Sequence, residues 1–356
     1  YFGIIHMNKL TKELTMNKLT KIGASALCGS LAAISAANAG DLSVTGGVDM
    51  SWISLDDEAT GNPLGIGSNL TFSGSGELDN GWSVALSVAH LNKDQYSNTN
   101  VTVTVPSLGD LRISQGVSGS GIDRMDDMTP NVWEEAYGTG LGTGINTVSG
   151  VSGSANIELT PNMLPEGLTG RISFAPSSGG NNNDKASSGA QSGAVAEGSG
   201  YDITLEASDA IHNVAGLTIY GGVSSTEQDS AGSTVSGDKD EETIGFKYAW
   251  GSFTVGYQWS EEDLGLSSGI DKYENDAYGV TFNVNDDLSI GYNNYKSDQT
   301  TINGATVEAK ASSIQVAYSM GGASIRLAEA SVDNAKYQTT AAYDRDATTL
   351  SISLAF

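Results

Sequence analysis

The chain has 356 residues, of which 17% are charged, and its 42 acidic residues outnumber its 17 basic ones. The formal net charge of −25 excludes nucleic acid as a partner, because phosphate binding requires clustered positive charge. The single cysteine, Cys28, excludes an internal disulfide as a source of stability.

Residues 1–39 have the order of an N-terminal extension followed by a secretory signal peptide. Lysines follow Met16, an apolar stretch covers residues 22–37, and Ala37-Asn38-Ala39 forms a small-residue cleavage site. The apolar stretch is shorter than the roughly 20 residues that a membrane helix requires. We therefore expect cleavage before Gly40, with Met7 and Met16 as alternative start residues.

The expected mature chain, residues 40–356, is even more acidic. Residues 1–39 contain four of the 17 basic and one of the 42 acidic residues, which leaves 13 basic and 41 acidic residues and a net charge of −28. Regularly spaced tyrosines and tryptophans favour a folded chain over a disordered one. No apolar run after residue 40 reaches the length of a membrane helix, so a mature chain that enters a bilayer must do so as a closed barrel.

Alternating apolar residues, typical of β-strands with one apolar face, recur along the whole mature chain. We expect seven short turns near residues 80, 107, 164, 212, 251, 286 and 321. Eight longer loops are expected near residues 60, 95, 135, 187, 232, 266, 301 and 338. These fifteen connections predict sixteen antiparallel strands, with both termini at the short-turn end. A barrel of that size encloses an aqueous channel.

The end of the chain has a pattern that points to one family. Leu350–Phe356 ends in an aromatic residue preceded by apolar residues at every second position, like the C-terminal signature of outer-membrane barrels. Together with the signal peptide, the alternation of turns and loops, and the segment Pro106–Ile113, this pattern resembles the trimeric general porins of alphaproteobacteria.

The resemblance implies an all-β, 16-stranded antiparallel transmembrane β-barrel in the outer membrane of a Gram-negative cell. Its turns would be periplasmic and short, its external loops long, and Phe356 would be the signal for the outer-membrane assembly machinery. The implied partners are outer-membrane lipid, lipopolysaccharide and two further copies in a homotrimer. The implied function is passive diffusion of small hydrophilic solutes and ions.

The third long loop, residues 116–155, is the longest connection in the chain. In the family that the chain resembles, the third loop folds into the barrel and narrows the pore. Pro130, Trp133 and Tyr137 suit a loop that packs against a wall. The acidic residues of this loop that would face the pore are Asp123, Asp126, Asp127, Glu134 and Glu135. An acidic surface loop in solvent is the alternative.

Residues out of phase with the outward apolar stripe of a strand must point into the lumen. This rule places four basic residues on the channel face: Arg112, Arg171, Lys247 and Arg326. The resemblance implies that they oppose the acidic loop and create a transverse field that orients dipolar solutes. In the alternative interpretation, each one balances a neighbouring carboxylate on the wall.

The sequence contains few residues that could form a catalytic or metal-binding site. Only His90 and His212 remain after residue 39, so neither an enzyme nor a histidine metal site is expected. The acidic clusters at residues 56–58 and 238–242 could hold calcium, but neither has the spacing of an EF-hand loop, and no cofactor is expected. The competing functions are a cell-surface adhesin or structural β-protein without a pore, and an outer-membrane lipid hydrolase.

Overall fold

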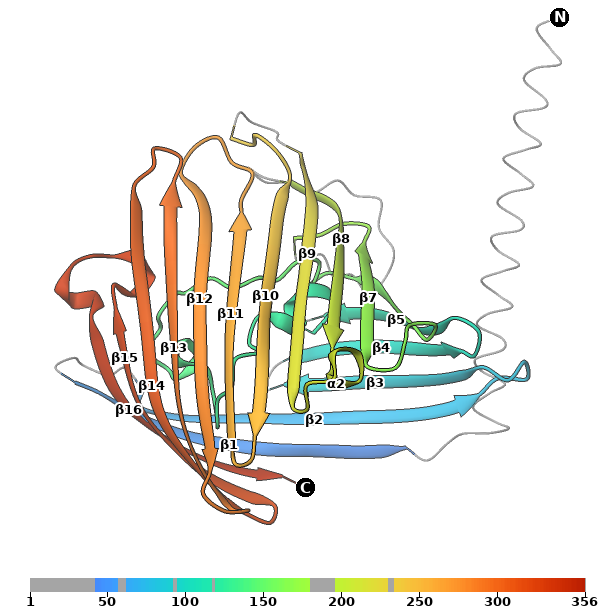
Figure 1. Cartoon of the computed structure of the whole chain (residues 1–356), viewed down its shortest axis with the longest axis horizontal. Coiled ribbons are helices and arrows are strands. Elements are labelled where there is room, and N and C mark those ends of the chain that lie inside the picture. The colour runs from blue at the N-terminus through green and yellow to red at the C-terminus, as the bar shows by residue number, and fades with distance from the viewer. Residues whose placement is uncertain are drawn as a thin grey trace, which may run out of the picture.

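The chain folds into one closed antiparallel β-barrel of sixteen strands (Figure 1). The structure, a computed structural model, describes residues 42–56, 62–91, 95–116, 119–179, 196–229 and 234–355. The expected signal peptide and Phe356 lie outside these residues. Within the described ranges, no helix is long and apolar enough to cross a membrane.

The strands follow one another around the barrel in chain order. Their bounds are β1 (Ser43–Leu55), β2 (Leu64–Glu77), β3 (Ser83–Leu91), β4 (Gln95–Val105), β5 (Gly109–Gly116), β6 (Asn156–Pro161), β7 (Leu168–Ala175), β8 (Ala196–Ala207), β9 (Leu217–Asp229), β10 (Lys239–Trp250), β11 (Phe253–Asp263), β12 (Ile270–Asn283), β13 (Leu288–Thr301), β14 (Thr306–Met320), β15 (Ala323–Asp333) and β16 (Arg345–Ala355). Short helices are η1 (Gly121–Met125), η2 (Ala136–Gly138), α2 (Asp209–His212), η3 (Ala335–Tyr337) and η4 (Ala341–Tyr343).

The barrel closes where β1 pairs with β16, from Gly47 opposite Ala355 to Leu55 opposite Ala347. Every strand therefore has two partners, and in the described part of the chain the sheet has no edge strand, as a bilayer requires. Strands on opposite walls cross in Figure 1 because strands tilt relative to the axis of a barrel. The predicted sixteen-stranded antiparallel barrel is confirmed.

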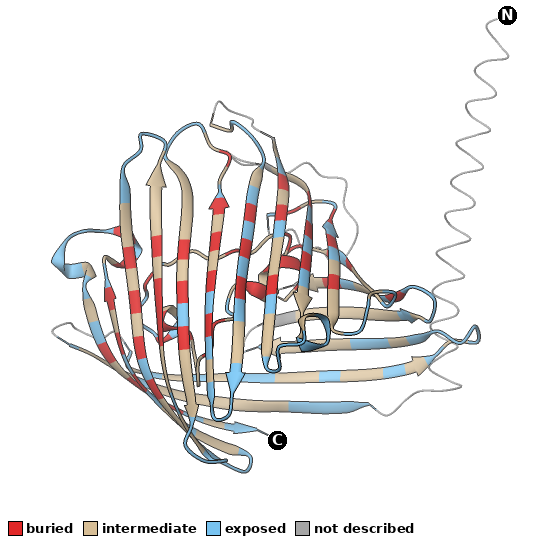
Figure 2. Cartoon of the chain, viewed as in Figure 1, coloured by how far each residue is buried: buried red, intermediate tan, exposed pale blue. Residues whose placement is uncertain are grey.

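The side-chain distribution across the wall is the reverse of that in a soluble protein. In β10, Ile244 and Phe246 are exposed on the outer face, whereas the neighbouring Thr243 points inward and is buried. Other buried inner residues are also polar, such as Gln258 and Asn293. Figure 2 shows the resulting alternation of buried and exposed bands along β8 to β14. This pattern suits a wall with lipid outside and a polar interior.

The seven short turns all lie where the sequence predicts them, at one end of the barrel. The connections at the other end vary more than expected. The chain passes from β3 to β4 between Leu91 and Gln95, and from β13 to β14 between Thr301 and Thr306. Both connections are short because the paired strands extend up to these residues. Residues that would otherwise form a longer loop belong to the strands.

Candidate functional site

The loop between β5 and β6 turns into the barrel and follows its inner wall. Its first helix, η1, contacts β7, β8, β9 and β10, and its second helix, η2, contacts β13, β14 and β15. Figure 1 shows this segment behind the strands β9 to β14. The loop thus lies along the inner wall over most of the barrel's circumference.

Buried carboxylates of the wall hold both ends of this loop. They project inward from β6, β8 and β10, and their side chains accept hydrogen bonds from backbone N–H groups of the loop. The pairs are Gly121 with Glu158 (2.8 Å), Ile122 with Asp202 (3.0 Å), Val151 with Asp202 (3.2 Å), Ser149 with Glu241 (2.8 Å) and Gly150 with Glu241 (2.7 Å). A buried carboxylate needs such donors, so the loop and the wall stabilise each other.

Amide side chains of the wall hold the middle of the loop. Gln315 in β14 accepts a hydrogen bond from the backbone N–H of Trp133 at 3.1 Å. Asn293 in β13 donates to the carbonyl oxygen of Glu134 at 3.1 Å, and Gln258 in β11 donates to that of Asp126 at 3.3 Å. Thr129 bonds the hydroxyl of the buried Tyr295 at 2.8 Å.

Apolar packing and the connection between β15 and β16 hold the part of the loop around residues 141–146. Leu141 lies in a buried cluster with Ala330, Val332, Ala335 and Ala347, from β15, η3 and β16. Tyr337, in the connection between β15 and β16, places its hydroxyl 3.2 Å from the backbone nitrogen of Asn146 and 2.7 Å from Ser297. The loop is therefore fastened from β6 around to β16.

The acidic loop residues lie close to one another. Burial raises the pKa of Asp126, and the neighbouring carboxylates Asp127 and Asp123 raise it further. Burial also raises the pKa of Asp123, although that carboxylate accepts hydrogen bonds from the backbone of Gly119 and from Ser152. Asp127 is exposed. Repulsion between these carboxylates and their partial burial thus make Asp126 and Asp123 easier to protonate than a free aspartate.

The two glutamates of the loop differ in their partners. Burial raises the pKa of Glu135 to about 7, although the side chain of Asn131 donates a hydrogen bond to it. Burial raises the pKa of Glu134 as well, whereas the guanidinium of Arg326 acts in the opposite direction. The positive charge of Arg326 on the wall thus partly offsets the effect of burial on the pKa of Glu134.

The four basic residues predicted for the channel face all lie on the inner side of their strands. Arg326 forms an ion pair with Asp49 at 2.9 Å, and Arg112 donates to the carbonyl oxygen of Gly119 at 2.9 Å. Arg171 and Lys247 are half-buried on β7 and β10. Among the described residues, no ion pair joins these four side chains to a carboxylate of the loop.

Two basic residues outside the predicted set of four have closer acidic partners. Arg124, on the loop, pairs with Glu158 of the wall. Lys239 lies 2.7 Å from both Glu241 and Glu262 on the inner face. The phase rule that selected Arg326 could have selected Lys239 and these carboxylates too, because they follow the same alternation.

The acidic segment 238–242, a candidate for calcium by its sequence, is divided by the alternation of β10. Lys239 and Glu241 point inward, whereas Asp240 and Glu242 point outward. Residues 57 and 58 of the other acidic cluster lie outside the described residues. In the part of the chain that the structure describes, no group of three or more His, Cys, Asp or Glu residues is placed to hold a metal ion.

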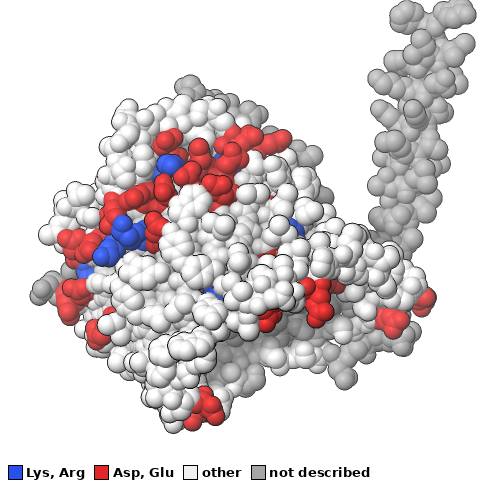
Figure 3. Space-filling model, viewed as in Figure 1, with Lys and Arg blue, Asp and Glu red and all other residues white. Residues whose placement is uncertain are grey.

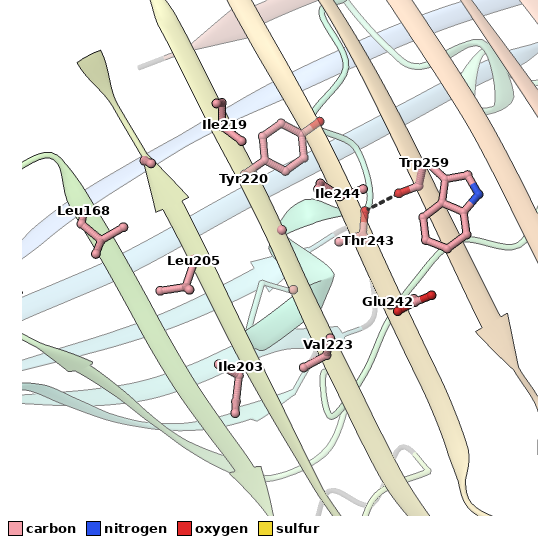
Figure 4. Close-up of a pocket in the computed structure, with 13 residues that line it drawn as sticks. Leu168, Ile203, Leu205, Ile219, Tyr220, Val223, Glu242, Thr243, Ile244 and Trp259 are labelled. Atoms are coloured by element: carbon pink, nitrogen blue, oxygen red, sulfur yellow. Dashed lines mark hydrogen bonds between the residues drawn. The ribbon is translucent and has the colours of Figure 1, made fainter. Parts of the chain in front are cut away.

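An apolar pocket lies on the outside of the barrel. It has a volume of about 590 Å³ and is lined by residues of β7 to β11, including Leu205, Ile219 and Ile244 (Figure 4). These side chains belong to the outward apolar stripe. Figure 3 shows acidic and basic side chains gathered above this uncharged belt. The pocket is therefore part of the lipid-facing surface, and the candidate functional site is the inserted loop with the inner wall.

Comparisons with known proteins agree with this geometry. The sequence profile of the family described as Gram-negative porin matches residues 23–356. The structure is similar to an anion-selective porin from Comamonas acidovorans, with a TM-score of 0.64 and 13% identity over 89% of this chain and 99% of that chain. It is also similar to OmpF of Salmonella typhi in complex with daunomycin, with a TM-score of 0.65 and 11% identity over 89% and 98% of the two chains.

A third similar structure is the trimer form of OmpT, an outer-membrane protein of Vibrio cholerae. Its TM-score is 0.62 and its identity 12%, over 89% of this chain and 100% of that chain. At these identities the similar structures support the fold alone. No curated protein sequence matches the chain.

Proposed function

Because the chain belongs to the Gram-negative porin family and is an outer-membrane channel for passive diffusion, we propose that residues 116–155 form the constriction that limits which solutes pass. The observation that carries the proposal is the fastening of this loop to the inner wall by Glu158, Asp202, Glu241 and Gln315. A loop held in this way occupies part of the lumen. The family lends no support to an adhesin without a pore.

The charge of the loop supports a preference for cations. Asp123, Asp126, Asp127, Glu134 and Glu135 lie within 13 residues, and the only basic residue among them, Arg124, is paired with Glu158. On the wall, Asp49 neutralises Arg326. Fixed charges that line a narrow aqueous pore control which ions pass, so we propose that small cations and neutral hydrophilic solutes pass most readily.

The proposed channel is a homotrimer and not an enzyme. We propose that the chain forms a homotrimer, as the trimer form of OmpT does, in contact with lipid and lipopolysaccharide. Phe356 would serve the assembly machinery. The channel would act by diffusion alone, as a non-enzyme that needs no cofactor, and residues 1–39 would be absent from the mature protein.

Neutralising the loop tests the proposed constriction. In a variant with Asp126→Asn, Asp127→Asn, Glu134→Gln and Glu135→Gln, the reversal potential in a salt gradient across a planar bilayer should shift toward anions. The matched control removes four outward carboxylates instead, with Asp240→Asn, Glu242→Gln, Glu261→Gln and Asp263→Asn. The control should select ions as the wild type does, since its charges lie outside the lumen. Equal shifts in the two variants would contradict the proposed role of the loop.

A further inference from the structure

Glycines of the inner wall lie directly beneath the middle of the inserted loop. A Cβ atom added to Gly279 in β12 would lie 2.1 Å from the carbonyl oxygen of Pro130. One added to Gly256 in β11 would lie 2.6 Å from Cδ of the same proline. One added to Gly291 in β13 would lie 3.1 Å from Cγ1 of Val132. At Gly279 the backbone of the loop thus lies closer to the wall than a side chain would permit, whereas at Gly256 and Gly291 it is side chains of the loop that approach the wall.

Close approach is the reason for glycine at these positions. Gly256 and Gly279 are register partners in regular pairing between β11 and β12, and neither has the positive φ that favours glycine. Glycine inside a strand is otherwise unfavourable, because it contributes no side chain to packing. Gly279 is the most restrictive of the set, since the three atoms nearest to its added Cβ all belong to the backbone of Pro130.

The loop cannot avoid a larger side chain by sliding along the wall. On one side of Pro130, Gln258 bonds the carbonyl group of Asp126, and on the other side Gln315 and Asn293 bond Trp133 and Glu134. Pro130 itself is buried against the wall. The open direction for displacement is away from the wall, toward the lumen.

We propose that Gly279, with its partner Gly256, determines the size limit of the channel. The absence of a side chain there sets the depth at which the segment from Asp126 to Glu134 lies on the wall, and so the width that remains for solutes. This inference rests on the proposed function of the loop as the constriction. Gly279 is a positioning residue, because it acts through the loop.

The variant Gly279→Ala tests the inference. Ordinary van der Waals contact begins at 3.4 Å, so the carbonyl group of Pro130 must move away from the wall by more than 1 Å. We expect single-channel conductance to fall by roughly a quarter, and the uptake of larger sugars into proteoliposomes to fall more steeply than that of small ones. The control is Gly74→Ala in β2, where an added Cβ meets nothing within 4 Å. It should leave both measurements unchanged.

A channel with a shortened loop separates this inference from the proposed function. Removing residues 126–134 should raise conductance, and in that background Gly279→Ala should have no effect. If removal leaves conductance unchanged, the loop is not the constriction. If removal raises conductance but Gly279→Ala in the full chain leaves it unchanged or raises it, only the present inference is wrong. Should Gly279→Ala fail to insert, Gly256→Ala tests the same inference, because the added Cβ would lie 2.6 Å from Cδ of Pro130, and no fall in conductance would overturn it.

Discussion

The two faces of β10 give neighbouring glutamates opposite surroundings. Glu241 points inward and is 3% exposed. It accepts hydrogen bonds from the loop and forms an ion pair with Lys239. Glu242, the next residue, points outward and is one of the residues that line the apolar pocket on the outside of the barrel (Figure 4). The residue type is the same, so the phase of the strand decides whether a carboxylate holds the loop or faces the surroundings of the barrel.

The largest effect should follow from removing an inner carboxylate. Asp202 is fully buried and accepts hydrogen bonds from Ile122 and Val151, which lie near the two ends of the loop. Asp202→Ala would leave both donors buried without a partner, so we expect the free energy of unfolding to fall by about 2 to 4 kcal/mol. Denaturant unfolding of the barrel in lipid vesicles measures this change.

The outer carboxylate provides the control for Asp202→Ala. Glu242→Ala removes an exposed side chain from the same wall, and its effect should stay within about 0.5 kcal/mol. If the two variants unfold at the same denaturant concentration, the inner carboxylates do not hold the loop and the contrast between the two faces is wrong.

A smaller effect should follow from pH. Burial raises the pKa of Glu135 to about 7, and that of Asp126 is also raised, so both carboxyls lose protons as pH rises from about 6 to 9. Negative charge then appears at the loop, and cation preference should increase over that interval. A raised folded pKa also means that the stabilisation of the protonated loop is lost as pH rises. Reversal potentials at pH 6 and 9 test the increase.

The double variant Asp126→Asn, Glu135→Gln sharpens the pH test. It keeps the size of both side chains and removes both titrations, so its selectivity should be nearly flat across the same interval. Persistence of the full pH dependence in this variant would assign the titration to other groups.

The smallest effect should follow from breaking an ion pair on the outer face. Lys272 contacts Glu261 at 2.6 Å and Glu274 at 3.4 Å, and all three side chains are partly exposed. Exposed pairs contribute little, so Lys272→Ala should lower the free energy of unfolding by less than about 1 kcal/mol and leave conductance unchanged. A loss as large as that of Asp202→Ala would mean that the outer pairs, too, hold the barrel together.

The local sequence pattern was sufficient to predict the strands of the wall but not the contacts inside the barrel. Apolar alternation and turn residues act over a few positions, so they predicted sixteen strands and the inward direction of Arg112, Arg171, Lys247 and Arg326. The same alternation did not show which inward residues meet one another. Arg326 finds its ion-pair partner in Asp49, 277 residues earlier in the chain, because closure brings β1 beside β16 and thus near β15.

The sequence by itself determined the class of the protein, because alternation, charge and the terminal aromatic pattern are properties of short segments. It also determined the length and acidity of the loop at residues 116–155. Only the tertiary structure decided what that loop contacts. Trp133 and Gln315 are 182 residues apart and meet because the loop that carries Trp133 enters the lumen that β14 faces. Gly279 acquires a role only when Pro130 lies on it, since a missing side chain matters only where another part of the chain fills the space.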